Sequence, residues 1–398
     1  MGYRLRVIGY GLWVMALLLT ACQQQGAVEG NAVLRVELQA DGLDSIRNIV
    51  FTAHDINMDK YYEDSTLTMT LPVGYYDLSI KAISNGKQVR AYQRGVKVTR
   101  DIVLPLQAIV LRDRKDFVLA EIFFAGTETP EGKRYLGDKY FVVYNNSNDT
   151  LSADGLVLIE ADLNSVQKYE LTPDFRSAYF AVDAMYRIPG DGRTYRVAPG
   201  QAILIADNAM DHTEANTRSF DLSQADFEWY DVSSSAGISD VDNPAVPNME
   251  KIYCYTYTIW VPHNQGHKSF GLARFPEGMT DEDYFANDAY YIRYEYEIVT
   301  AAGAYKQSKK SYVLPNEWIV DAVNLAPKET FQWLTISDTL DAGYTYVAPT
   351  GSDKTRFGKA VRRKTLEETN GHRILQDSNN STEDFETAVT ADPYYFKR

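Results

Sequence analysis

Two histidines, His263 and His267, have the spacing that comes nearest to a metal-binding motif in this sequence. On a helix, imidazoles four residues apart share a face and can hold zinc together. Pro262 and Gly266 favour a loop instead, and the glutamate that follows the first histidine of a zinc protease motif is missing. We therefore predict a hydrogen-bonded loop at 263–267, with a metal site as the alternative.

Two oxygen-rich stretches, 240–243 and 377–381, offer the carboxylates and carbonyls that calcium prefers. Their carboxylates belong to Asp240, Asp242 and Asp377. Neither stretch has the glycine and the terminal glutamate of an EF-hand loop. Because Asp and Asn also build turns by hydrogen bonding to their own backbone, we interpret both stretches as turns, with the three aspartates as the alternative metal ligands.

The sequence contains no recognisable motif for a catalytic nucleophile. Cys254 lies in KIYCYTYTIW, whose alternation is typical of a strand, and no base lies near it in the sequence. We expect Cys254 to be a small buried side chain. The sequence contains no G-x-S-x-G elbow and no glycine-rich phosphate loop. We predict no enzymatic activity and no cofactor, and a calcium- or zinc-assisted hydrolase is the remaining enzymatic alternative.

Aromatic side chains are dense between residues 220 and 270, where they could form a face for a ligand or a protein partner together with His263 and His267. Aromatic residues anchor protein interfaces and line ligand pockets. The alternative is that they only pack against the rest of the fold. The aromatic members of this set are Phe227, Trp229, Tyr230, Trp260 and Phe270.

The composition excludes several classes of protein. The formal net charge of −14 repels nucleic acid, so we predict no nucleic-acid partner. Five histidines among 398 residues leave little material for a histidine metal cage. The chain has only two cysteines, Cys22 and Cys254, and the first is assigned a different role below, so we predict no disulfide.

The N-terminus has the features of a lipoprotein signal peptide over residues 1–21. Arg4 and Arg6 precede an apolar run that is too short to span a bilayer. The run ends in LTAC (19–22), which resembles a lipobox, so Cys22 is the expected site of lipidation and the membrane attachment. Gln23 is not an inner-membrane retention signal, so we predict an outer-membrane location. Whether the protein faces the periplasm or the cell surface is left open, because residues 23–28 contain no acidic tract.

After a short polar tether at 22–30, residues 31–112 predict a compact β unit. AVLRVELQA and NIVFTAHDI alternate apolar and polar residues, as half-buried strands do. The segment LPVGYYDLSI (71–80) resembles the L-P-x-G-x-Y-x-L hairpin of prealbumin-like and carboxypeptidase-regulatory-like domains. That resemblance implies a β-sandwich in which the tyrosine of the motif packs back on the sheet.

Residues 117–398 follow a charged break, RDRKD (112–116), and predict a second β-sandwich. Its motifs are an apolar strand at 117–126, YFVVYNNSNDT (140–150), LSADGL (151–156) and VAPGQAILIA (197–206), and near the end FGKAVRRK and DSNNSTEDF. This order resembles a lamin-tail-type immunoglobulin-like domain. The predicted fold is therefore mainly β, with two immunoglobulin-like β-sandwiches in tandem.

Residues 207–310 have no counterpart in that motif order, so we predict a long irregular insertion in the second sandwich. Within it, SQADFEWY (223–230) favours one or two helical turns, with Ser223 as the N-cap and Asp226 at the third position. Long insertions between sandwich strands often carry function.

The whole of 31–398 resembles a family of Bacteroidota lipoproteins of unknown function. The stretches that carry this resemblance are DLSQADFEWYD (221–231), DVDNPAVPNM (240–249), HNQGHKSFGLARFP (263–276) and LPNEWIVDAV (314–323). It implies an outer-membrane lipoprotein of two β-domains that sometimes accompanies a TonB-dependent receptor, and it implies no activity.

Two non-enzymatic functions follow from these observations. The first is a lipid-anchored envelope protein that binds a partner or ligand, with a TonB-dependent receptor as the partner that the resemblance suggests. The second is a structural or adhesive surface lipoprotein without a small ligand.

Overall fold

The computed structural model describes residues 30–40, 43–85, 87–110, 116–300, 303–369 and 372–398. They are mainly β, which confirms the predicted fold class. The chain divides into two compact units, Met1–Arg112 and Asp113–Arg398, and each is described by itself. The predicted signal peptide, Cys22 and all of the tether except its last residue lie outside the described residues.

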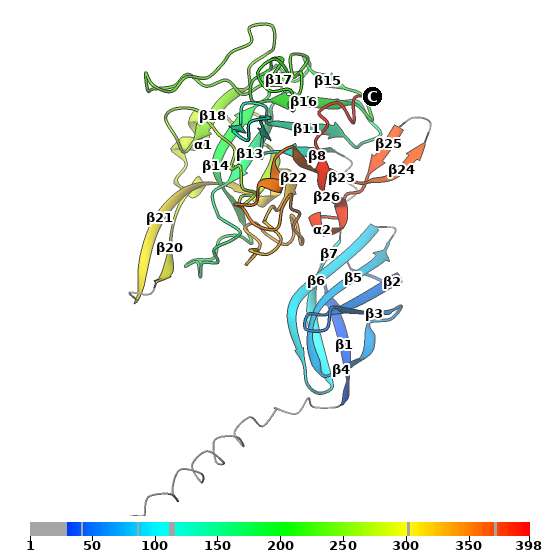
Figure 1. Cartoon of the computed structure of the whole chain (residues 1–398). Coiled ribbons are helices and arrows are strands. Elements are labelled where there is room, and N and C mark those ends of the chain that lie inside the picture. Colours follow the sequence, from blue (N-terminus) through cyan, green and yellow to red (C-terminus); the bar gives the residue numbers. More distant parts are fainter. Residues whose placement is uncertain (1–29, 41–42, 86, 111–115, 301–302, 370–371) are drawn as a thin grey trace, which may run out of the picture. The chain divides into compact units, whose positions relative to one another are not determined.

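The first unit is one seven-stranded sheet that folds over on itself (Figure 1). Strands β1 and β7 form the parallel pair, in which residues 34–39 lie beside residues 102–107. Residues 108–110 of β7 then pair antiparallel with β6. In order across the sheet, the strands are β3 (Lys60–Asp64), β2 (Ile46–Asp55), β5 (Gly74–Ser84), β6 (Lys87–Val98), β7 (Ile102–Val110), β1 (Asn31–Gln39) and β4 (Thr68–Pro72).

Alternate residues of these strands fill one core, as the sequence pattern predicted. In β1, Ala32, Leu34 and Val36 are buried and the residues between them are exposed. The tyrosine of the L-P-x-G-x-Y-x-L motif, Tyr76, is fully buried, and its hydroxyl donates to the carbonyl of Pro72 at 2.7 Å. The predicted packing of this tyrosine is confirmed.

The second unit is a sandwich of two large sheets, which Figure 1 colours from cyan through green to red. The first sheet runs β17 (Phe227–Glu228), β16 (Ala202–Ala206), β11 (Tyr140–Asn145), β8 (Phe117–Phe123), β23 (Lys359–Arg363) and β26 (Phe385–Thr390). The second runs β20 (Tyr291–Thr300), β21 (Gly303–Pro315), β14 (Tyr179–Arg187), β13 (Leu156–Ala161), β19 (Phe270–Arg274) and β22 (Ile319–Val323), and β18 (Glu250–Cys254) pairs with β14.

Short elements complete this unit. The two-stranded ribbons are β9 (Thr127–Glu128) with β10 (Arg134–Tyr135), β12 (Leu151–Ser152) with β15 (Arg196–Val197), and β24 (Thr365–Thr369) with β25 (His372–Leu375). The helical turns are α1 (Asp281–Ala286), α2 (Ser381–Asp384), η1 (Asp288–Tyr290), η2 (Asn316–Trp318) and η3 (Lys354–Arg356). No helix in the described part of the chain is long and apolar enough to cross a membrane.

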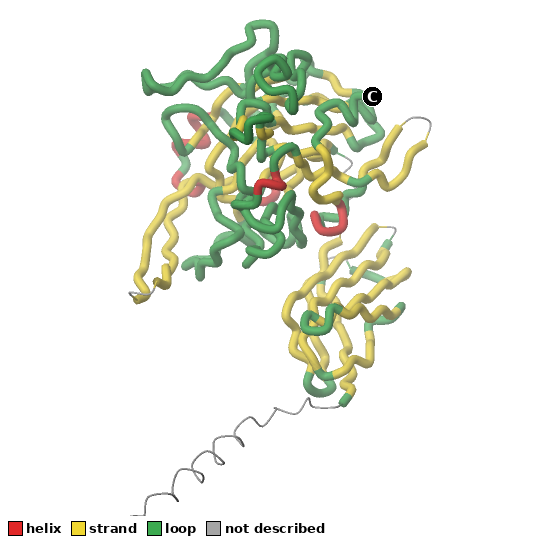
Figure 2. Tube along the Cα trace, viewed as in Figure 1, coloured by secondary structure: helices red, strands yellow, loops and turns green. Residues whose placement is uncertain are grey.

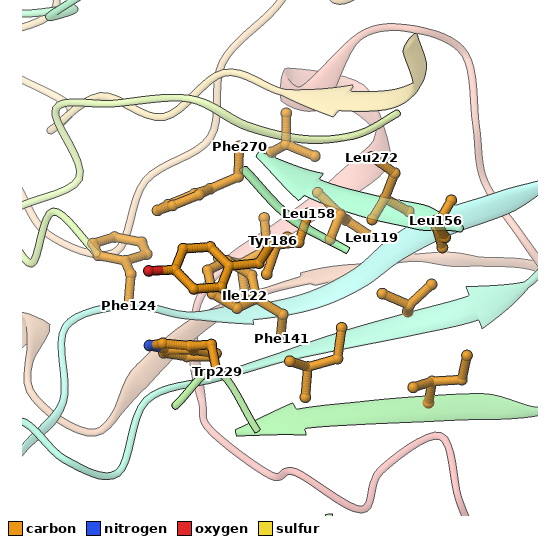
Figure 3. Close-up of a cluster of buried hydrophobic side chains, with 14 of the residues drawn as sticks. Leu119, Ile122, Phe124, Phe141, Leu156, Leu158, Tyr186, Trp229, Phe270 and Leu272 are labelled. Carbon is orange, nitrogen blue, oxygen red and sulfur yellow. The ribbon is translucent and has the colours of Figure 1, made fainter. Parts of the chain in front are cut away.

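The main core lies between the two sheets. Figure 3 shows Leu119 and Ile122 of β8 and Phe141 of β11 gathered with Leu158 of β13 and Leu272 of β19. Both outer faces of the sandwich carry further apolar clusters, to which loop residues contribute. Figure 2 shows how much of this unit is loop. Strands β8, β11 and β13 are therefore buried along their whole length.

The structure corrects the predicted irregular insertion at 207–310. This segment contains β17 to β20 and the start of β21, and β19 lies between β13 and β22 inside the second sheet. The run FGLAR of β19 is buried on both faces, so it shows no alternation that would mark it as a strand in the sequence. The immunoglobulin-like and lamin-tail-like topologies stay predictions from their motifs.

The helical turns expected at 223–230 do not form. Asp226 instead bonds to β16: its backbone N–H donates to the carbonyl of Leu204 at 2.9 Å, and its carboxylate accepts from the Leu204 N–H at 2.7 Å. The next two residues pair with β16 as the short parallel strand β17. The edge of the sheet thus offers this segment better backbone partners than a short isolated helix would.

We expect Tyr76→Phe to lower the free energy of unfolding of the first unit by about 1 kcal/mol, because the Pro72 carbonyl loses its buried donor. Tyr75→Phe is the matched control, since Tyr75 is 44% exposed. Urea unfolding followed by far-UV circular dichroism would measure the change. Tryptophan fluorescence should not follow it, because the described tryptophans all lie in the second unit. Equal effects of the two substitutions would contradict the expectation.

Candidate functional site

Four of the five aromatic residues proposed as a binding face lie in the core of the second unit. Phe227, Trp229, Trp260 and Phe270 are each at most 1% exposed and belong to the cluster between the sheets. Tyr230 is half-buried. Side chains this deeply buried cannot form an exposed face, so packing describes the role of these four, as Figure 3 shows for Trp229 and Phe270.

Trp260 contacts both sheets and is hydrogen bonded to two buried carboxylates. Its ring stacks on Tyr186 with centroids 4.8 Å apart and lies parallel to Phe141 at 6.2 Å, so it fills the space between the two sheets. Its indole Nε1–H donates to Glu160 at 2.8 Å, and its backbone N–H donates to Asp231 at 2.6 Å. Both N–H groups are thereby satisfied inside an apolar core.

Asp231 joins several loops from its buried position. Besides the Trp260 N–H, its carboxylate accepts from the Tyr186 hydroxyl at 2.7 Å and from Lys251 Nζ at 2.8 Å. Its own backbone N–H donates to the carboxylate of Asp240 at 2.9 Å. The segments 231–241 and 255–261 are also joined by a hydrogen bond, which the Ser234 N–H donates to the Tyr257 carbonyl.

These two segments carry a group of exposed apolar side chains, which we call the loop surface. Tyr257 is 87% exposed and Val232 is 79% exposed, although the loops that carry them are fixed to the core. Exposed aromatic and aliphatic side chains on ordered loops are candidate anchors for a protein partner, because a few such side chains carry most of the binding energy of an interface. The loop surface consists of Val232, Ile238, Val241, Tyr255, Tyr257 and Val261.

The histidine pair lies in a loop, as predicted. The rings of His263 and His267 are 4.7 Å apart, and the backbone N–H of His263 donates to Glu160 at 2.7 Å. Burial, and then the neighbouring His267, lowers the pKa of His263 to about 4. Burial, and then Arg356, lowers the pKa of His267. Both imidazoles are therefore largely neutral at pH 7.

A cavity of about 580 Å³ opens beside His267, and we call it the polar cavity. Most of its lining is uncharged and polar. Its polar lining residues are Gln265, His267, Glu329, Thr330, Gln332, Thr350 and Ser352, and Val166, Phe331 and Gly351 complete it. No sequence pattern points to this site, because its lining combines four loop segments that are distant along the chain.

A second groove of about 580 Å³ lies beside β15 and β16 and contains the cations Arg196, Lys397 and Arg398. Lys397 is already bound to Asp226 at 2.6 Å, and Arg398 is paired with Asp392. Because internal carboxylates occupy two of its three cations, this groove offers little free charge to a ligand.

The aspartates considered as metal ligands have internal partners. Asp240 accepts from the Asp231 N–H and from the Val241 N–H, as expected of a turn. Asp242 accepts from the Asn248 amide at 2.9 Å, and Asp377 accepts from Arg363 at 3.2 Å. No group of three or more metal-binding side chains occurs within the ranges that the structure describes.

Cys254 is the one cysteine among the described residues, and its surroundings do not activate the thiol. Cys254 is a free thiol at the end of β18, and it is half-buried rather than fully buried as predicted. Burial raises the pKa of this thiol, which disfavours the nucleophilic thiolate. Cys22, the predicted lipidation site, lies outside the described residues.

Several residues that organise this region are absent from the sequence-based predictions. Asp231 closes the stretch DLSQADFEWYD, but nothing in its neighbours shows that it is buried. Tyr255 and Tyr257 could have been found, because the alternation in KIYCYTYTIW places them on one face with Tyr253. Glu160 carries no such signal, since it interrupts an otherwise apolar strand.

Comparison with known proteins supports a domain of unknown function. Residues 198–392 match the model of a family described as a protein of unknown function (DUF4876). This range includes the four stretches that carried the sequence resemblance. The crystal structure of a DUF4876 family protein from Bacteroides thetaiotaomicron VPI-5482 is similar, with a TM-score of 0.58 and 18% identity over 92% of this chain and 96% of that chain. This identity supports a shared fold alone. No curated protein matches the chain.

Acid should weaken the second unit through His263. An imidazole whose pKa is lower in the folded state stabilises the protein above pH 6.5, and this contribution is lost as the pH falls towards 4. We expect the stability difference between the parent and His263→Gln to shrink by about 2 kcal/mol between pH 7 and pH 4, allowing for partial solvent screening. Urea unfolding monitored by tryptophan fluorescence would measure it. A difference that stays constant across this range would contradict the assignment.

Proposed function

We propose that the protein is a non-catalytic, lipid-anchored component of the bacterial cell envelope that binds a protein partner through the loop surface. The observation that carries the proposal is the exposure of Val232 and Tyr257, at 79% and 87%, on loops that are joined by the buried bond from Trp260 to Asp231 and by the bond from Ser234 to Tyr257. Rigid loops lose little conformational entropy when a partner binds, so exposed apolar groups on them are effective anchors.

An outer-membrane TonB-dependent receptor is the partner we propose. The support is the sequence resemblance to lipoproteins that accompany such receptors, and the lipobox at Cys22, which would hold the protein at the same membrane. A large receptor has the loops needed to cover an apolar surface. We propose no catalytic role, because the buried carboxylates and the thiol described above are engaged in packing and hydrogen bonding.

Affinity purification of the tagged protein from gently solubilised outer membranes tests this function. We expect a receptor to co-purify in near-stoichiometric amounts with the parent. The double variant Val232→Ser/Tyr257→Ser should reduce its recovery at least tenfold, because truncation of two anchors typically costs more than about 1.4 kcal/mol.

The matched control is Tyr305→Ser/Leu366→Ser, which removes two exposed apolar side chains of the same unit outside the loop surface. This variant should recover the receptor as the parent does. The absence of any receptor from the parent preparation, or the same loss with both double variants, would overturn the proposed function.

Membrane attachment has its own test. We expect Cys22→Ser to abolish incorporation of labelled palmitate and to move the protein into the soluble fraction, because the acyl chains supply the membrane affinity. Cys254→Ser is the matched control and should leave both properties unchanged, since Cys254 lies at the end of a strand within the second unit. Palmitate labelling that persists in Cys22→Ser would show that the anchor has been assigned to the wrong residue.

A further inference from the structure

The polar cavity has walls that are fixed before any ligand arrives. The Ser165 N–H donates to the His267 carbonyl at 2.8 Å, and the Gln332 N–H donates to the Ser165 carbonyl at 3.0 Å. On the other side, the Glu329 N–H donates to the Pro349 carbonyl at 2.9 Å. Backbone hydrogen bonds thus join the four loop segments of the cavity, as expected of a preformed binding site.

Gly351 allows two of these loops to approach closely. A Cβ atom at this position would lie 2.4 Å from Nε2 of His267 and 3.2 Å from Cβ of Gln265. Any larger residue would therefore displace the imidazole or narrow the cavity. The close approach keeps the imidazole edge of His267 at the cavity wall.

The lining offers hydrogen-bond donors and acceptors without a strong charge. The Gln265 amide and the Glu329 carboxylate have no hydrogen-bond partner among the residues that the structure describes. Gln332 uses its amide oxygen to accept from the Lys168 N–H at 2.9 Å, which leaves its NH₂ group for a ligand. A neutral His267 adds one donor and one acceptor.

The same lining argues against other classes of ligand. No lysine or arginine lines the cavity, so an anion would find no counter-charge in a protein whose net charge is already −14. Only His267 and Glu329 are metal-binding side chains, too few for a metal centre. Val166 and Phe331 give the lining some apolar surface, but a purely apolar ligand would leave the amides and hydroxyls of the other lining residues without hydrogen-bond partners.

We propose that the polar cavity binds an uncharged polyhydroxylated ligand, a neutral saccharide of one to three sugar units. Each hydroxyl of a sugar both donates and accepts, which matches amides, hydroxyls and a neutral imidazole. The volume of about 580 Å³ lies within the usual range for small-molecule sites. This site is independent of the loop surface, so either can fail without the other.

The purified chain should be tested on an array of neutral and acidic oligosaccharides, followed by calorimetric titration with the free sugars that bind. We expect binding to neutral members and none to acidic ones. Gln265→Ala should weaken the binding about tenfold, and Gly351→Ala should weaken it further, because the added methyl group displaces His267. Binding only to array-linked glycans would identify a glycoconjugate as the source, and binding to free sugars as well would identify a soluble saccharide.

Gln307→Ala is the matched control, since it removes an exposed glutamine amide from β21, away from the lining. It should bind as the parent does. Gln265→Ala removes a side chain without an internal partner, so it keeps the test valid even if Gly351→Ala fails to fold. The proposal is overturned if no neutral oligosaccharide binds at millimolar concentration, if acidic oligosaccharides bind in preference, or if Gln265→Ala and Gln307→Ala bind alike.

Discussion

The double hydrogen bonding of Trp260 is the interaction on which the rest of the second unit depends. The indole ring fills the gap between Tyr186 and Phe141, and a ring in that position carries two N–H donors into a dry core. Each donor needs an acceptor, since an unsatisfied buried N–H costs about 1–3 kcal/mol. Glu160 and Asp231 supply the acceptors. The positions of these two carboxylates constrain the backbone on either side of Trp260 and at Asp231. The loop surface and the loop at 263–267 therefore both depend on this one buried side chain.

The same constraint applies to two buried ion pairs of this sandwich. Asp321 of β22 accepts two N–H bonds from Arg363 of β23 at 2.9 and 2.8 Å, so the ion pair connects the two sheets. Glu121 of β8 similarly accepts from Arg362 at 2.6 Å. Pairs of this kind add little net stability, because desolvation opposes the attraction, but a broken pair leaves an uncompensated charge. They therefore favour one arrangement of strands and loops over its alternatives, and loops covering both outer faces keep them dry.

The sequence predicted the elements whose signal is local. Alternation located β1, and the turn chemistry of LPVGYYDLSI located the buried Tyr76. It could not reveal β19, because a strand buried on both faces has no period. The alternation in KIYCYTYTIW places Tyr257 and Trp260 on opposite faces, but it could not show which face is buried, and Trp260 is 1% exposed while Tyr257 is 87% exposed. That difference is set by Asp231 and Glu160, which lie far from the segment in the sequence or on another strand.

The loop surface carries exposed apolar side chains on hydrogen-bonded loops, and the stability of the fold does not require this combination. Val232 and Tyr257 bury little area, so they contribute little to the hydrophobic stabilisation of the fold. Asp231, the residue before Val232, nevertheless accepts the Trp260 N–H although it is only 2% exposed, and burial of its carboxylate carries a desolvation cost. A loop with no role beyond connecting two strands would be stable with polar residues at these positions and without the buried anchor. Because hydrogen bonds already join the two segments, a partner that bound here, as we propose, would have less loop motion to arrest.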